Sequence, residues 1–107
     1  GVTARVDYVQ GVPPVVNDPG CNAILSAAAL SVLGPTGQTS VPQSLGGEDF
    51  GWYTAQVPGA MFRLGTRTPG GPTYDLHQGN LQVDERAIGL GARLLAEAAI
   101  AGLVTDV

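Results

Sequence analysis

The chain has 107 residues, 44% of them hydrophobic and 13% charged, a composition typical of one small globular domain and not of a disordered segment. Its net charge is −4, and its five basic residues are arginines scattered along the sequence. We therefore expect no nucleic-acid partner, because phosphate binding needs a clustered basic face. A single cysteine cannot form an internal disulfide, which favours a reducing, cytoplasmic location, and no stretch is long and apolar enough to predict a membrane span.

The first predicted elements are a strand and a helix. Residues 1–10 alternate apolar and polar side chains, a period of two that predicts a half-exposed strand. Pro13 and Pro14 end it, because proline lacks the backbone donor of a β-ladder. Asp18 as N-cap and Pro19 as first residue then predict a helix, which Gly34 ends.

The second half predicts two more helices and a long loop. An acidic first turn and a closing Pro-Gly pair predict a short helix over residues 48–57, followed by a short strand over 60–64. Residues 65–79 read as a loop, long enough to suggest a function. Asp84 is the predicted N-cap of a last helix that runs to about Gly102.

This order of elements predicts an α/β fold with an incomplete sheet. Each of the two long helices carries a broad apolar stripe with small residues on it, among them Ala28, Gly91 and Ala98. Such stripes favour close packing on a sheet, but the chain supplies few strands. We therefore expect most of that sheet to lie outside this chain, and the exposed apolar surface to drive association.

Two sites are candidates for chemistry, and each has a simpler interpretation. His77 is the only histidine, and one imidazole cannot form a catalytic zinc site, which needs about three protein ligands. A hydrogen-bonded or solvated loop residue is therefore the simpler interpretation. Gly46 and Gly47, followed by Glu48 and Asp49, could bind an anion at a helix N-terminus or form a flexible turn. Cys21 lies on an apolar stripe, which favours packing over reactivity.

Five segments in order nevertheless resemble a known family. They read GVPPVVND (residues 11–18), GGEDF (46–50), VPGAMFRLG (57–65), LH (76–77) and DERA (84–87). This series resembles the C-terminal end of the metal-dependent amidohydrolases that include hippurate hydrolase, N-acyl-amino-acid amidohydrolase and indole-acetyl-amino-acid hydrolase. The resemblance spans nearly the whole chain.

The resemblance implies a fold and a division into domains. Residues 1–10 would be the final strand of an α+β lid or dimerisation domain. Residues 11–107 would be the C-terminal part of a three-layer αβα catalytic domain of the zinc-peptidase type. The incomplete sheet and the half-exposed first strand would both follow from this division.

The resemblance also implies an activity. Family members cleave the amide bond of N-acyl amino acids or small peptides with water activated by two divalent metals, zinc foremost, with Mn, Co or Ni as alternatives. His77 occupies the position of a metal ligand, and Gly46, Gly47, Glu48 and Asp49 resemble a segment that contacts substrate or supports the site. The family's His-x-Cys-Gly-His-Asp segment and Glu-Glu pair, which carry the other ligands and the general base, are absent from this chain.

We therefore expect no catalytic residue in this chain and no activity of the chain alone. The expected partners are the N-terminal remainder of the same enzyme, a small N-acyl amino acid or peptide substrate, and further copies in a homo-oligomer. The alternative is a non-catalytic binding or interaction module derived from the same domain.

Overall fold

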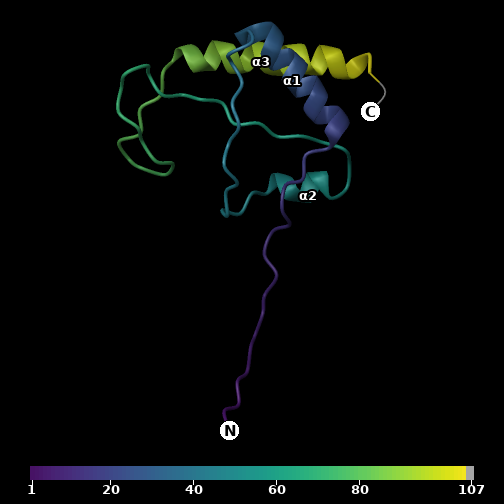
Figure 1. Cartoon of the computed structure of the whole chain (residues 1–107), viewed down its shortest axis with the longest axis vertical. Helices are drawn as coiled ribbons and strands as arrows, with labels where there is room; N and C mark the ends of the chain where they lie inside the picture. The colour runs from purple at the N-terminus through teal and green to yellow at the C-terminus, as the bar shows by residue number, and fades with distance from the viewer. Residues whose placement is uncertain (106–107) are drawn as a thin grey trace.

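The computed structural model describes residues 1–105, in which there are three helices and no strand. The helices are α1 (Pro19–Leu33), α2 (Phe50–Thr54) and α3 (Arg86–Leu103). Figure 1 shows α1 crossing α3 at one end of the molecule, with α2 below the pair and the N-terminal segment running away from all three. The Cα radius of gyration is 17.9 Å, whereas a compact chain of this size has about 13 Å, so much of the chain lies away from a common centre.

Helix α1 begins and ends where the sequence predicts. The Asp18 backbone is extended, and its carboxylate accepts a hydrogen bond from the Cys21 N–H at 2.9 Å, which satisfies one free donor of the first turn. Pro19 follows at the first helical position. Gly34 ends the helix in the left-handed region at φ +76°, and its N–H donates to the Leu30 carbonyl.

Helix α3 starts slightly later than predicted, and α2 is shorter than predicted. Helix α3 starts at Arg86 with Glu85 as its N-cap, so the prediction of Asp84 as N-cap is wrong by one residue. The Asp84 carboxylate still accepts from the Arg86 N–H at 3.0 Å. At α2, the Glu48 Oε1 likewise accepts a hydrogen bond from the first helical N–H, that of Phe50, at 3.1 Å. Both acidic residues therefore act from just before the helix and not from inside its first turn.

The core of the described residues lies where α1 crosses α3. Its buried hydrophobic residues are small alanines and one leucine: Ala28 and Ala29 on α1, Ala87 and Leu94 on α3. Small side chains let the two helix backbones approach closely. Most large apolar side chains of the described residues are exposed, and Ile88 and Leu95 of α3 are among them. The two helices therefore bury only part of their apolar stripes.

The segment from Gly59 to Thr66 passes beneath the helix pair (Figure 1). Gly91 of α3 allows this close passage, because a Cβ atom there would lie 2.9 Å from Cδ2 of Leu64. The small residues on the helical stripes were predicted to pack on a sheet; within residues 1–105 Gly91 instead faces the irregular segment that carries Leu64. The α/β expectation is not met within residues 1–105, because neither 1–10 nor 60–64 forms a strand.

The physical reason is the same for both segments. A strand requires backbone hydrogen bonds to a neighbouring strand, and no such neighbour exists in residues 1–105. Residues 1–12 are exposed throughout, and the only side-chain hydrogen bond among them joins Arg5 to Asp7 at 3.1 Å, on one side of the segment. None of the helices described in residues 1–105 has the length and apolar character that a bilayer crossing requires.

Candidate functional site

His77 lies on an exposed turn of the long loop between residues 65 and 79. Its backbone has φ +66°, and it is the only non-glycine residue with positive φ in residues 1–105. A side chain in this region strains the backbone, and such strained residues concentrate at functional sites. No hydrogen bond holds the imidazole to the rest of the described chain, so its ring nitrogens are accessible. Of the two simpler interpretations, a hydrogen-bonded or a solvated loop residue, the structure shows the solvated one within residues 1–105.

The loop that carries His77 is held by local contacts. The Arg67 guanidinium donates to the Thr73 hydroxyl at 3.1 Å, and the Gly71 N–H donates to the Thr68 carbonyl at 2.9 Å. At its far end, the Leu81 N–H donates to the Gln78 carbonyl at 3.1 Å, which closes the turn directly after His77. The position of His77 is thus defined by turns in its own loop and not by packing against a helix.

The Gly46–Asp49 segment forms the approach to α2. All four residues are exposed, and the Gly46 N–H donates to the Ser44 hydroxyl at 3.2 Å. The segment lies against the proline connector: a Cβ on Gly47 would lie 3.1 Å from a methyl group of Val12. Glu48 uses one carboxylate oxygen to cap α2, which leaves the other oxygen and the Asp49 carboxylate facing solvent.

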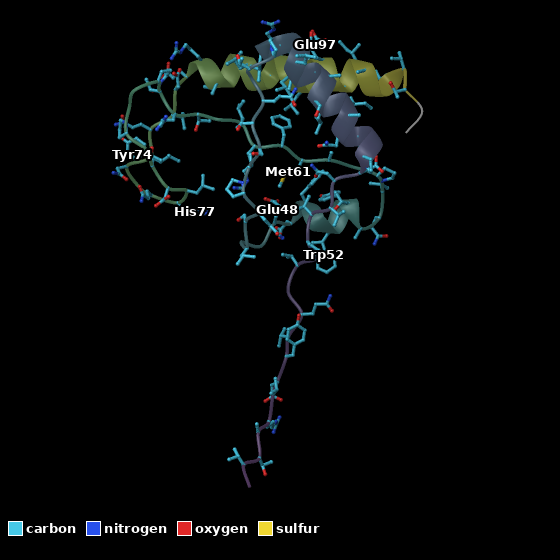
Figure 2. The ribbon with its side chains drawn as sticks, in the orientation of Figure 1. Glu48, Trp52, Met61, Tyr74, His77 and Glu97 are labelled. Carbon is cyan, nitrogen blue, oxygen red and sulfur yellow. The ribbon has the colours of Figure 1, made fainter. Side chains whose placement is uncertain are left out.

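The two candidate segments share one side of the molecule but do not meet. In Figure 2, His77 and Glu48 both lie on the side of the helix pair from which the N-terminal segment leaves. No hydrogen bond or ion pair joins His77 to Glu48 or Asp49 in the part of the chain that the structure describes. Nor do any three His, Cys, Asp or Glu side chains of residues 1–105 lie close enough together to hold a metal ion. Within residues 1–105, therefore, the structure does not assemble a metal site from this chain's own side chains.

Asn17 makes a contact that the sequence reasoning missed. Its amide Nδ2 donates to the Met61 carbonyl at 2.9 Å, and its Oδ1 accepts from the Met61 N–H at 2.9 Å. The next residue, Asp18, donates its backbone N–H to the Gly59 carbonyl at 2.9 Å. Together these bonds fasten the start of α1 to residues 59–61. The only sequence signal was an asparagine directly before the N-cap, which by itself predicts no partner.

Three ionisable groups outside the candidate segments have shifted pKa values: Asp84, Arg86 and Cys21. The pKa of Arg86 is raised, chiefly because its guanidinium donates to the Asp84 carboxylate. The pKa of Asp84 is lowered to about 2, chiefly because its carboxylate accepts from the Arg86 guanidinium, with Nε–Oδ1 at 2.8 Å, and also from the Arg86 N–H. The pKa of the Cys21 thiol is raised by partial burial and by the neighbouring Asp18 carboxylate. A raised pKa disfavours the thiolate, which supports the interpretation of Cys21 as a packing residue.

The sequence of this chain is similar to parts of several known proteins. A protein of Rhodococcus jostii provisionally named a glutamate–cysteine ligase is 49% identical over 94 residues, which are 88% of this chain and 12% of that protein. A provisionally named hydrolase of Synechocystis is 40% identical over 101 residues, 92% of this chain and 26% of that protein. N-acetyldiaminopimelate deacetylase of Shouchella clausii is 36% identical over 85 residues, 79% of this chain and 21% of that protein.

This chain thus spans between 12% and 26% of the length of these curated relatives. No solved structure matches it. The sequence profile of peptidase family M20/M25/M40 matches residues 2–101, nearly the whole chain. The match confirms the resemblance to amidohydrolases that the five motifs indicate: the chain belongs to peptidase family M20/M25/M40 and corresponds to part of such an enzyme.

Proposed function

We propose that this chain is the C-terminal part of a dinuclear metal amidohydrolase that cleaves the amide bond of N-acyl amino acids or small peptides. Membership of the peptidase family supports the hydrolytic chemistry, and the relative named N-acetyldiaminopimelate deacetylase supports the substrate class. The same proposal assigns residues 1–10 to the last strand of a lid domain. It assigns residues 11–107 to a three-layer αβα catalytic domain.

The observation that carries this proposal is the left-handed backbone of His77. The motif series singles out this residue as a metal ligand, and the structure singles out the same residue by its φ of +66°. A positive φ is uncommon for residues other than glycine and costs of order 1–3 kcal/mol, and asparagine, aspartate and histidine are the side chains that adopt it most often. A histidine in such a conformation, with its ring exposed, is consistent with selection for the imidazole itself.

The residues of this chain fit one ligand position of a metal centre. An imidazole nitrogen is a standard zinc ligand, and the exposed ring of His77 can bind without breaking a bond to the described chain. When bound, divalent metals activate water for attack on an amide carbonyl and stabilise the negative charge that develops on its oxygen. The role of His77 is to hold such an ion, zinc or alternatively Mn, Co or Ni, together with ligands from outside this chain.

The Gly46–Asp49 segment is proposed to face the substrate. Gly46 and Gly47 carry no side chains that would block the approach of a ligand to their backbone, and Glu48 and Asp49 keep carboxylate oxygens in solvent. Because Glu48 also caps α2, its role is support of the site, with α2 fixing the direction of the loop. The general base and the remaining metal ligands are assigned to the rest of the enzyme.

The ligase name of the Rhodococcus relative does not change this assignment. A similar number of matched residues makes up 12% of that protein but 26% of the Synechocystis hydrolase, so the ligase-named protein is much the longer chain. Its name can therefore describe sequence that lies outside the matched segment. The matched segment itself also falls within the peptidase family in this chain.

A conformation-matched substitution tests the role of His77. Asparagine tolerates the left-handed region but lacks the imidazole, so His77→Asn removes the ligand with little change in backbone strain. We expect the full-length His77→Asn protein to lose bound metal in elemental analysis and to lose hydrolysis of N-acetyl amino acids by at least about 100-fold. Gln78→Ala, one residue along the same exposed turn, is the control and should keep both.

The result separates the proposal from its alternative. Retention of metal and activity by His77→Asn would remove His77 from the ligand set. If the unsubstituted full-length protein binds no divalent metal and hydrolyses no N-acyl amino acid, the non-catalytic binding module becomes the better description.

A further inference from the structure

The loop that carries His77 is closed at its base by one backbone bond. The Asp84 N–H donates to the Thr66 carbonyl at 2.7 Å, just before α3 begins. The other hydrogen bonds between residues 66 and 84 each lie within one arm of the loop, on one side of His77 or the other. Figure 1 shows this loop, in green, extending away from the beginning of α3. Within residues 1–105, the bond from Asp84 to Thr66 is therefore the one hydrogen bond that joins the two arms.

Asp84 is also fixed on the side of α3. Its carboxylate accepts from the Arg86 N–H at 3.0 Å and from the Arg86 Nε at 2.8 Å. Its carbonyl accepts from the N–H of the buried Ala87 at 2.9 Å. The Asp84 side chain is only 14% exposed, whereas that of Arg86 is 72% exposed, so the guanidinium shields a carboxylate that is mostly covered. The N–H, the carbonyl and the carboxylate of Asp84 are thus all bonded, and this one residue joins the loop to the helix.

The arm from His77 to Asp84 is the shorter of the two arms. The turn that the Leu81 N–H closes on the Gln78 carbonyl takes up its first part, which leaves two residues before Asp84. The opposite arm, residues 66–76, is longer and has turns of its own. The conformational freedom of a chain segment rises with its length, so the short arm limits the position of the imidazole more than the long one does. That position relative to α3 therefore depends on where Asp84 anchors the short arm.

A metal ligand on a loose loop binds weakly, because the loop must be ordered when the ion binds. Residues that orient a metal ligand are typically worth about 10–100-fold in metal affinity. We propose that Asp84 is the positioning residue of His77: it keeps the base of the loop closed and so presents the imidazole to the metal in one place. This inference rests on the proposed role of His77 as a metal ligand. In this assignment Asp84 contacts neither metal nor substrate, and Arg86 holds Asp84 in place.

Asp18 provides a matched control for the loss of Asp84. Each carboxylate accepts from an N–H in the first turn of a long helix, at 2.9 Å for Asp18 and 3.0 Å for Asp84. Each backbone N–H donates to a distant carbonyl, that of Gly59 or of Thr66. Asp18→Ala and Asp84→Ala therefore remove the same kind of bond from the start of α1 and of α3. Only Asp84 lies at the base of the loop that carries His77, so a difference between the two variants reports on positioning and not on helix stability.

The zinc affinity of the full-length protein gives the first test. We expect Asp84→Ala to raise the zinc dissociation constant at least about tenfold, and Asp18→Ala to leave it within about twofold of the unsubstituted protein. Asp84→Asn should recover most of the affinity, because its amide oxygen can still accept from Arg86. Equal affinities of the two alanine variants, whether both strong or both weak, would overturn the proposal. An affinity of Asp84→Asn no better than that of Asp84→Ala would overturn it as well.

A second readout needs neither metal nor activity. In the metal-free full-length protein with isotope-labelled histidine, the amide signal of His77 is the one that His77→Asn lacks, and its NMR order parameter measures how firmly the loop holds it. We expect an order parameter of about 0.8 in the unsubstituted and Asp18→Ala proteins and below about 0.6 in Asp84→Ala. An unchanged order parameter in Asp84→Ala would overturn the proposal.

The variants also separate this inference from the role of His77 on which it rests. If His77→Asn loses zinc but Asp84→Ala does not, the positioning role of Asp84 fails and the ligand role of His77 stands. If His77→Asn keeps its zinc, the ligand role of His77 fails, and the positioning role fails with it.

Discussion

Substituting Gly51 by alanine tests the packing of α2 against the proline connector. A Cβ atom on Gly51 would lie 2.2 Å from the Pro13 carbonyl oxygen and 3.0 Å from the Pro13 carbonyl carbon. Carbon and oxygen atoms in close non-bonded contact lie about 3.3 Å or more apart, so helix and connector must separate by about 1 Å. Both atoms of Pro13 belong to the backbone, and no side-chain rotation can relieve the clash.

The size of the effect follows from two opposing terms. Overpacking costs about 1–3 kcal/mol of unfolding free energy, and a clash between backbone atoms belongs in the upper part of that range. Replacing glycine by alanine within a helix stabilises the helix by up to about 1 kcal/mol. We therefore expect Gly51→Ala to destabilise the protein by about 1–2 kcal/mol net.

Gly89 of α3 provides a matched control. A Cβ atom there meets nothing within 4 Å, so Gly89→Ala should show the helix-propensity gain alone. Urea unfolding followed by far-UV circular dichroism measures both variants, and the difference between them isolates the clash. If Gly51→Ala were as stable as Gly89→Ala, the close passage of the connector over α2 would be refuted.

Three further predictions rest on single contacts. Asp18→Ala should lower the free energy of unfolding by about 1 kcal/mol in the same urea assay, because it removes the cap on the Cys21 N–H; an unchanged midpoint would contradict the cap. The Asp84 carboxylate should titrate near pH 2 by NMR, and Arg86→Ala should raise the Asp84 pKa towards its usual value. Because the folded-state pKa of Asp84 is lowered, the bond to Arg86 stabilises the fold fully above the unfolded pKa of about 3.9. This stabilisation is lost as the pH falls through about 2. An Asp84 midpoint at the usual value would show that the ion pair does not form in solution. Cys21 should react with a thiol reagent at pH 7 more slowly than free cysteine, since burial raises its pKa, and a faster reaction would contradict the packing role.

The helices were predictable because their signals are local. The cap at Asp18, the proline after it and the glycine at position 34 each act within one turn, and they set both ends of α1 correctly. The acidic residues at positions 48 and 84 also marked helix starts, though the structure places them just outside the helices. Capping depends only on neighbouring residues, so the sequence contains the information needed.

The strands and the candidate site were less predictable because they depend on distant partners. Residues 1–10 and 60–64 have the pattern of strands, but pattern alone cannot supply the neighbouring backbone that a ladder requires. The bond between Asn17 and Met61 joins residues 44 positions apart, which no local rule detects. The positive φ of His77 could not be predicted either, because a histidine in the sequence does not indicate positive φ as a glycine does.

The two-residue attachment at Asn17 and Asp18 has a mechanical consequence. Both residues are fastened to the Gly59–Met61 segment, and they lie exactly between the extended N-terminal segment and the first turn of α1. A pull transmitted along residues 1–16 would therefore load residues 59–61 together with the first turn of α1, which Asp18 caps. Movement of the N-terminal segment would therefore reach the chain directly before Phe62 as well as the start of α1.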